Sequence, residues 1–373
     1  MKKLKIALAA NDTTYTYNLR KAILSRLLSE GHEVIVVAKK MLFQEELQNM
    51  GCRLVEVETN RHGMNPFSEL SLFRSYWKIL KEDKPDLVLS YNIKPNSYAG
   101  IACHWQKIHH IPNITGLGTP LETPGIFQRL FRFLYKSGVS GADCIMFQNS
   151  DNKQYFCRHN MLKKNTRTRL IPGSGVDLNE HEVLPYPDDK DQVHFLFIAR
   201  VMKEKGIDQY LNVAKRVCER HPNTVFDICG YCDDIKYLSL LEEAHQQGYI
   251  QYHGEQKRLK DFFAIAHCIV HPSYYPEGMS NVLLEAAAHG RPIITTDRAG
   301  CRETVDDGKS GYVIPIKDED ALVNAIERFL SLSWEEKRDM GLAGRKKIEK
   351  EFDRQFVVET YIEEVEKIIQ NQP

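Results

Sequence analysis

Short apolar runs alternate with amphipathic stretches along most of the chain. The stretch "YNLRKAILSRLLSEG" has helical spacing and ends on Gly, as helices commonly do. Strands that alternate with such helices pair in parallel through crossover connections. We therefore predict an α/β fold of two Rossmann-like, doubly wound domains facing each other across a cleft. The predicted strands are "LKIALAA", "EVIVVA", "RLVEVE", "DLVLSY", "IPNIT" and "DCIMFQ", followed by "VHFLFIA", "TVFDIC", "YIQYHG", "CIVHPS", "RPIITT" and "GYVIP".

A linker divides the two series of strands. The segment "GVDLNEHEVLPYPDDKDQ" is rich in Pro and Asp, and the length of 373 residues suits two domains. We place the first domain at 1–178 and the second at 179–353, with a last helix at about 354–370 that can pack back on the first. Sheets of this kind bind ligands at the carboxyl ends of their strands, so the expected site lies in the cleft.

The amino-acid composition indicates which classes of partner and which cellular compartment suit the protein. Lys plus Arg equals Asp plus Glu at 50 each, so no overall field attracts nucleic acid. The nine cysteines are an odd number spread through apolar segments, which favours reduced thiols in the cytoplasm. The start "MKKLKIALAANDTTY" reads as a first strand rather than a signal peptide, and no apolar run approaches the roughly 20 residues that span a bilayer. We expect a soluble or peripheral protein.

The stretch "PEGMSNVLLEAAAHG" predicts a seat for a phosphate group. A helix should begin at Ser280 as N-cap and end at Gly290. The first amides of that helix, from Met279, Ser280 and Asn281, have no helical acceptor and favour an anion such as a diphosphate. Gly278 would let the backbone come close to it.

Charged residues on either side of this seat indicate a nucleotide-sugar. Glu277 and Glu285 flank the helix start, and carboxylates accept hydrogen bonds from the paired hydroxyls that a sugar and a ribose carry. In "FIARVMKEKGIDQYL", Arg200 and Lys205 stand at the carboxyl end of another strand. They would neutralise the diphosphate as it departs.

These motifs resemble the E-x7-E and Arg/Lys signatures of family 4 of the retaining glycosyltransferases, also called group 1, which have the GT-B fold. The segments "HEVIVVA", "KPDLVLS", "IPGSGVDL" and "AGCRETVDDGKSGYVIPIKDEDAL" fall in the family's order. The resemblance implies that Glu277 contacts the donor sugar, Glu285 the ribose, and Arg200 and Lys205 the diphosphate. It further implies a UDP-sugar donor, with the uracil read near Gly254 and Glu255, and transfer with retention to give an α-linkage.

Other segments depart from the common family pattern. A Gly-Gly loop is replaced by "AANDTTYTYNLRKAI", so Asn11 is a candidate for shaping that side of the cleft. In "NITGLGTPLETPG" no His is present, and Thr115 and Gly116 are candidates instead.

The forms "YNLRKAIL", "SYNIKPNSYAG" and "NITGLGT" are similar to a bacterial subgroup that extends lipid-linked saccharides for capsule, O-antigen or protein glycosylation. The subgroup implies an undecaprenyl-diphosphate-linked sugar as acceptor, with Lys94 as a candidate for its diphosphate. It also implies a peripheral position on the cytoplasmic face of the bacterial inner membrane.

The segment "GIFQRLFRFLYKSG" at 125–138 has two interpretations. One is an ordinary core-facing helix with a solvated basic face. The other is an interfacial helix that attracts anionic lipid. Its expected apolar stripe is Phe127, Leu130, Phe131 and Leu134, and its cations are Arg129, Arg132 and Lys136.

Several patterns that suggest metals are given structural interpretations. "CGYC" has no second pair to complete a zinc site, Asp318 in "DED" is expected to cap a helix, and "HH" at 109 and 110 and His271 are expected to be structural. We predict no metal and no cofactor, and the UDP-sugar is the donor substrate. Two alternatives stay open, a GT-B-type sugar-nucleotide epimerase and a non-catalytic nucleotide-sugar-binding subunit, whereas a nicotinamide oxidoreductase lacks its G-x-G-x-x-G turn.

Overall fold

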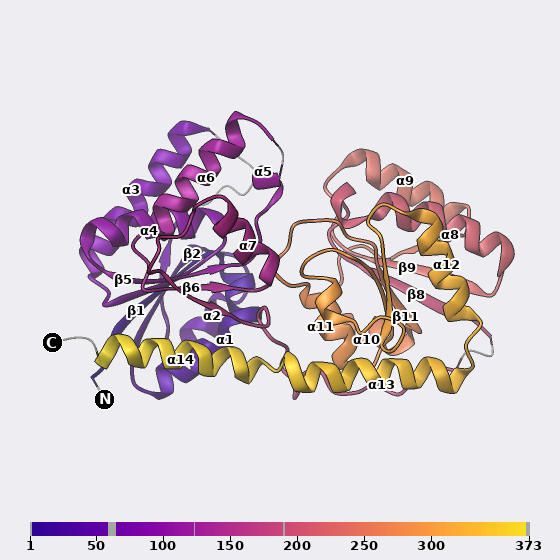
Figure 1. The fold of residues 1–373 in the computed structure, drawn as a ribbon. Coiled ribbons are helices and arrows are strands. Elements are labelled where there is room, and N and C mark those ends of the chain that lie inside the picture. The colour runs from indigo at the N-terminus through magenta and orange to yellow at the C-terminus, as the bar shows by residue number, and fades with distance from the viewer. Residues whose placement is uncertain (1, 59–64, 123, 189–190, 371–373) are drawn as a thin grey trace. The chain divides into compact units, whose positions relative to one another are not determined.

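The computed structural model describes residues 2–58, 65–122, 124–188 and 191–370, which form two α/β units (Figure 1). Within this part of the chain, the first unit holds the residues up to Ser174, the short segment Glu277–Met279, and the residues from Arg354 onward. The second unit holds Gly175–Pro276 and Ser280–Asp353. The segment Glu277–Met279 is thus grouped by its contacts with residues far from it in the sequence.

The first unit is built on a seven-stranded parallel sheet with the order β3-β2-β1-β4-β5-β6-β7. The order reverses between β1 and β4, and such a switch point opens a crevice at the carboxyl ends of the two strands. The strands are β1 (Lys5–Asp12), β2 (Glu33–Lys39), β3 (Arg53–Glu56), β4 (Leu87–Tyr91), β5 (His109–Ile114), β6 (Cys144–Phe147) and β7 (Arg167–Leu170).

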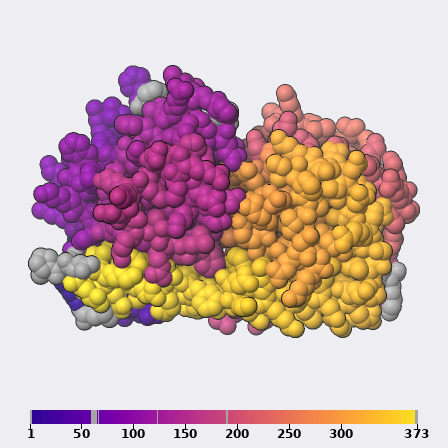
Figure 2. All heavy atoms as spheres, in the orientation of Figure 1, coloured from indigo at the N-terminus to yellow at the C-terminus, as the bar shows by residue number. Residues whose placement is uncertain are grey.

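Helices cover both faces of this sheet. Figure 1 shows α3, α4 and α6 on one face and α1, α2 and α14 on the other. In Figure 2 the yellow atoms of α14 lie against indigo and magenta atoms of the same unit, and Asn113 of β5 donates to the Tyr361 hydroxyl of α14 at 2.8 Å. The helices are α1 (Thr13–Ser29), α2 (Gln44–Asn49), α3 (Pro66–Asp83), α4 (Ile93–Gln106), α5 (Thr119–Glu122), α6 (Ile126–Val139), α7 (Ser150–Arg158) and α14 (Arg354–Gln370).

The second unit has a six-stranded parallel sheet with the order β10-β9-β8-β11-β12-β13, and its switch point lies between β8 and β11. Its strands are β8 (Val193–Ile198), β9 (Thr224–Cys229), β10 (Gln251–Tyr252), β11 (Cys268–His271), β12 (Ile293–Thr296) and β13 (Gly311–Ile314). Its helices are η1 (Lys203–Lys205), α8 (Ile207–Arg220), α9 (Ile235–Gln246), α10 (Leu259–Ile265), α11 (Asn281–Ala288), η2 (Arg302–Thr304), α12 (Glu319–Leu330) and α13 (Trp334–Glu351). Both sheets confirm the predicted α/β, doubly wound fold class.

The segment that replaces the family's Gly-Gly loop passes directly from strand into helix. β1 runs to Asp12, and α1 begins at the next residue because the Asp12 carboxylate accepts from the Tyr15 amide at 2.9 Å. The hydroxyl of Thr16 donates to the Asp12 carbonyl at 2.7 Å. This N-cap brings the helix start directly to the end of β1, and Asn11 lies inside the strand.

All nine cysteines are free thiols, as their spread along the chain predicted. Among the helices in the part of the chain that the structure describes, none is both long enough and apolar enough to cross a membrane.

Candidate functional site

Arg200 and Lys205 lie at the carboxyl edge of the second unit's sheet, where β8 leads into α8. Gly206 follows them with φ at 82°, and a Cβ there would come within 2.2 Å of the Pro272 carbonyl oxygen. Only glycine therefore lets this turn approach the segment that leaves β11. The Tyr274 amide ties the two segments by donating to the Glu204 carbonyl at 2.9 Å. The Lys205 turn thus stands at the switch point between β8 and β11.

The Lys205 ammonium lies in an environment that disfavours its charge. Burial lowers the pKa of Lys205 to about 8, and the positive charge of Arg200 acts in the same direction. The ammonium nitrogen lies 5.3 Å from the centre of the Tyr275 ring. An anion that brings its own negative charge would stabilise the protonated form.

The start of α11 follows β11 at the same edge. Ser280 is the N-cap by position, but its side chain makes no capping hydrogen bond, contrary to the usual role of serine there. Its amide donates to the Gly300 carbonyl at 2.8 Å, so the prediction that this amide is left open for an anion is wrong. Asn281 Oδ1 is buried without a hydrogen-bond partner in the described part of the chain. Glu285 is half-buried on the second turn. Met279 belongs by its contacts to the first unit.

Gly254 is linked through Gly230 to Ala199, the residue before Arg200. The Gly254 carbonyl accepts from the Gly230 amide at 2.8 Å, and a Cβ on Gly230 would come within 1.7 Å of the Ala199 carbonyl oxygen. Gly254 itself has φ at 68°, and the exposed Glu255 follows it. The turn at 254 and 255 therefore shares its edge of the sheet with Arg200.

A buried carboxylate anchors this turn, and sequence reasoning missed it. Asp227 of β9 is 2 % exposed, and its two oxygens lie 2.7 Å from His253 Nε2 and 2.8 Å from His194 Nδ1. Burial alone would raise the pKa of Asp227, but the hydrogen bonds from His194 and His253 outweigh it and lower that pKa. The Asp227 carboxylate thus fixes the side chain of His253, the residue that precedes Gly254.

Glu277 and Gly278 are fixed to the first unit through their main chains. The Gly278 amide donates to the Thr115 carbonyl at 2.9 Å, and Glu277 forms a β-bridge with Gly116. The Asn149 side-chain amide donates to the Glu277 carbonyl at 3.2 Å and to the Gly278 carbonyl at 2.5 Å. Thr115, Gly116, Glu277 and Gly278, predicted from separate motifs, are thus brought together.

Asn149 is a second residue that the sequence did not single out. Its side-chain oxygen also accepts from the Asn152 amide at 2.8 Å and so caps α7. The sequence feature that could have indicated this cap is the polar segment "QNSD" directly after the strand "DCIMF". Gly278 leaves no room for a side chain here, because a Cβ would come within 2.3 Å of Gln148 Oε1 and 2.7 Å of the Thr115 carbonyl carbon.

Lys94 opens α4 beside the switch point of the first unit. Its ammonium pairs with Glu69 Oε1 of α3 at 2.6 Å, and the Tyr98 hydroxyl donates to the other Glu69 oxygen at 2.7 Å. At the neighbouring strand end, the Asn92 side-chain amide donates to the Thr115 hydroxyl at 3.1 Å. Lys94 is therefore held in place by an acid.

Two of the residues that suggested metals, Asp318 and His110, have structural roles. Asp318 caps α12 by accepting from the Ala321 amide at 2.8 Å, as predicted. His110 Nε2 lies 2.7 Å from the Ser90 hydroxyl, and burial lowers the pKa of His110 to about 4. Across the described residues, no group of three or more His, Cys, Asp or Glu side chains is arranged to hold a metal ion.

Helix α6 differs from the expected single stripe. Phe131 and Leu134 are half-buried against the core. The exposed apolar set is instead Ile126, Phe127, Leu130 and Phe133, which are 77 %, 57 %, 50 % and 65 % exposed. The helix thus presents one apolar face to the core and leaves a second one in solvent.

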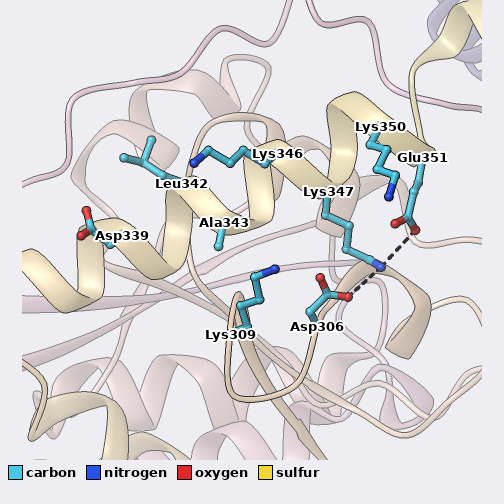
Figure 3. A pocket seen from close by; sticks show the side chains of 9 residues that line it. All are labelled: Asp306, Lys309, Asp339, Leu342, Ala343, Lys346, Lys347, Lys350 and Glu351. Carbon is cyan, nitrogen blue, oxygen red and sulfur yellow. Dashed lines mark hydrogen bonds and ion pairs between the residues drawn. The ribbon is translucent and has the colours of Figure 1, made fainter.

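A cavity of about 510 Å³ lies outside the predicted site, between α13 and the loop that carries Asp306 and Lys309 (Figure 3). Lys347 pairs there with Asp306 at 2.9 Å and with Glu351 at 3.1 Å. Burial alone would lower the pKa of Lys347, but these hydrogen bonds raise it. Both acidic and basic side chains line the cavity. Lys347 has a structural role there, because it pairs with two of the acids.

Two family models match the chain in succession. Residues 5–149 match the model described as "Glycosyl transferase 4-like", and residues 182–347 match the one described as "Glycosyl transferases group 1".

The chain is also similar, over nearly its whole length, to a named glycosyltransferase and to solved structures. A Campylobacter jejuni protein, N,N'-diacetylbacillosaminyl-diphospho-undecaprenol alpha-1,3-N-acetylgalactosaminyltransferase, is 25% identical over 99% of this chain and 100% of its own length. A glycosyltransferase structure from Rickettsia africae superposes with a TM-score of 0.78 at 16% identity and covers 100% of both chains. Anabaena HepE in complex with UDP and glucose superposes with a TM-score of 0.77 at 15% identity, over 97% of this chain and 100% of its own.

Proposed function

Since the chain belongs to the group 1 glycosyltransferases and has the GT-B fold, we propose that it moves a hexose or N-acetylhexosamine from a UDP-sugar to a lipid-diphosphate-linked saccharide. The name of the Campylobacter relative supports this acceptor class, and the ligands of the Anabaena structure support the donor class. The observation that carries the proposal is the Lys205 ammonium at the switch point of the second unit, whose pKa burial has lowered to about 8.

In the proposed reaction the diphosphate is stabilised as it leaves. Arg200, Lys205 and the first amides of α11 supply the positive charge in place of a metal ion. Glu285 accepts from the ribose hydroxyls, and the turn at Gly254 reads the uracil.

The transfer itself is proposed to occur with retention, as the family resemblance implies. The acceptor hydroxyl oxygen forms the new bond to the anomeric carbon on the face from which UDP departs. The bond from that carbon to the β-phosphate oxygen breaks, and a phosphate oxygen takes the hydroxyl proton. Glu277 holds the sugar hydroxyls, and Asn149 positions Glu277 through the main chain.

We further propose that the exposed face of α6 contacts a membrane. Ile126, Phe127, Leu130 and Phe133 would enter the headgroup region, and the exposed Arg129 would attract anionic lipid. This would bring the enzyme to its acceptor on the cytoplasmic face of the inner membrane.

A screen of UDP-sugars for protection against thermal unfolding tests the donor. A ligand at 100 times its Kd should raise the free energy of unfolding by about 2.7 kcal/mol. We expect one UDP-hexose or UDP-N-acetylhexosamine to protect more strongly than UDP alone, and Lys205→Met to lose this protection. If no uridine nucleotide protects the wild type, the donor assignment is wrong.

A further inference from the structure

The aromatic ring of Tyr275 lies against the Lys205 ammonium in the second unit. The ammonium nitrogen is 5.3 Å from the ring centre, within the roughly 6 Å over which the negative face of an aromatic ring attracts a cation. Both side chains are half-buried, and partial loss of water strengthens this attraction. The ring therefore favours the charged form of a lysine whose pKa burial lowers.

The main chain on both sides of Tyr275 fixes where the ring lies. The amide of Tyr274, the preceding residue, donates to the Glu204 carbonyl at 2.9 Å, so this segment and the Lys205 turn are held together. The Tyr275 carbonyl accepts from Arg298 Nε at 3.4 Å. The contact between ring and ammonium thus follows from how the two segments pack at the carboxyl edge of the sheet.

Arg200, His271 and Cys301 lie near the ammonium without attracting it at neutral pH. The charge of Arg200 repels it. Burial raises the pKa of the Cys301 thiol to about 11, and burial together with the lysine charge lowers the pKa of His271 well below its ordinary value, so both groups are neutral. Burial, Glu204 and Asp208 together raise the pKa of the tyrosine hydroxyl at residue 274. Among these neighbours the aromatic ring is the one that favours the charged lysine.

We propose that Tyr275 is a positioning residue that keeps the Lys205 ammonium charged at the switch point until the diphosphate binds. The inference rests on the proposed function and adds a residue that acts through Lys205 rather than on the substrate. The attraction comes from the π-electrons of the ring, so phenylalanine can replace Tyr275 and an aliphatic side chain cannot. Without the ring, the lysine releases its proton at a lower pH.

The pH dependence of the donor kinetics tests the proposal. Tyr275→Leu removes the ring and Tyr275→Phe retains it. Tyr274→Leu is the matched control, because that ring is also half-buried but lies 4.5 Å from the Lys317 ammonium instead. The attraction corresponds to a shift of about one pH unit. We therefore expect kcat/KM of Tyr275→Leu to equal wild type at pH 6 and to be about fivefold lower at pH 8, whereas Tyr275→Phe and Tyr274→Leu keep the wild-type pH profile.

Two patterns of kinetics would overturn the inference besides a Tyr275→Leu profile that matches wild type. A loss of equal size at pH 6 and pH 8 would show a merely structural role. A Tyr275→Phe that behaves like Tyr275→Leu would show that the hydroxyl acts rather than the ring face. Tyr275→Met is the second ring-free variant, used in the same way if Tyr275→Leu does not fold.

A measurement on the nucleotide-free protein separates this inference from the proposed function. The protein is labelled with carbon-13 at the ε-carbon of lysine, and the NMR signal of Lys205 is the one missing from Lys205→Met. Its titration midpoint should fall by about one pH unit in Tyr275→Leu and stay unchanged in Tyr275→Phe. If the midpoint falls in this way and no UDP-sugar reacts, the proposed function fails alone. A midpoint that does not fall in Tyr275→Leu contradicts the role of Tyr275 whatever the turnover.

Discussion

Replacing Lys205 by methionine should make the nucleotide-free protein more stable and remove its activity. The substitution exchanges a half-buried ammonium for an apolar side chain of similar length. The pKa of Lys205 is lowered by burial from 10.5 to about 8. A difference of 2.5 between these two values corresponds to about 3 kcal/mol by which folding disfavours the protonated form.

The sign of this effect depends on pH. Below pH 8 the lysine is protonated in both the folded and the unfolded state, so the wild type bears the whole penalty. Between pH 8 and 10.5 the folded state has released the proton and the unfolded state has not, and the penalty falls as pH rises. We therefore expect Lys205→Met to exceed wild type by as much as about 3 kcal/mol in the free energy of unfolding at pH 7. The two should converge near pH 10.5.

Activity should change in the opposite direction. Only the protonated lysine can neutralise the diphosphate, so kcat/KM for the donor should fall about tenfold per pH unit above pH 8. Lys205→Arg keeps its charge throughout this range and should show no such fall. Denaturant unfolding at pH 7, 9 and 10.5 tests the predicted difference in stability. Donor kinetics from pH 6.5 to 9.5 test the predicted fall in kcat/KM. A nucleotide-free Lys205→Met that is less stable than wild type at pH 7, or a flat wild-type profile, would refute the reasoning.

Four further tests address other parts of the account. Glu277→Ala should lower turnover about a hundredfold if it removes about 3 kcal/mol of transition-state stabilisation, and near-normal turnover would remove Glu277 from the site. Asn149→Asp keeps the acceptor that caps α7 but turns a buried carboxylate oxygen toward the Glu277 and Gly278 carbonyls, so stability should fall and kcat should fall at least tenfold; an unchanged kcat would show that the tether has no role. EDTA should leave activity intact, whereas loss that magnesium or manganese restores would contradict neutralisation by side chains. Wild type should co-sediment with anionic vesicles at low salt, and Phe127→Ser should weaken this more than Ile235→Ser, a change at an even more exposed apolar residue of α9; equal effects would exclude α6 as the contact.

The alternation of apolar runs and helical patterns predicted the fold well, because strands buried in a parallel sheet need continuous apolar sequence. The strand β7 was missed for the same reason. Its sequence "RTRL" lies at the edge of the sheet, where two arginines remain partly or fully exposed.

The candidate site was predicted where motifs carry the information, and it was missed where tertiary contacts do. Arg200 and Lys205 follow a strand, so their place at its carboxyl edge could be read from the sequence. No local pattern shows that Asn149 would reach Glu277, which is 128 positions away, or that Asp227 would join two histidines. The stripe on α6 was assigned wrongly in part, because helical spacing alone does not tell which of two apolar faces meets the core.

The most direct test of the central claim is the transfer of a labelled sugar from its UDP-sugar to a synthetic isoprenyl-diphosphate-linked saccharide, with the new bond analysed by NMR. The account predicts a lipid product with an α-linkage that wild type forms and Lys205→Met does not. Failure of the wild type to transfer any hexose or N-acetylhexosamine from a UDP-sugar, or formation of a β-linkage, would contradict it.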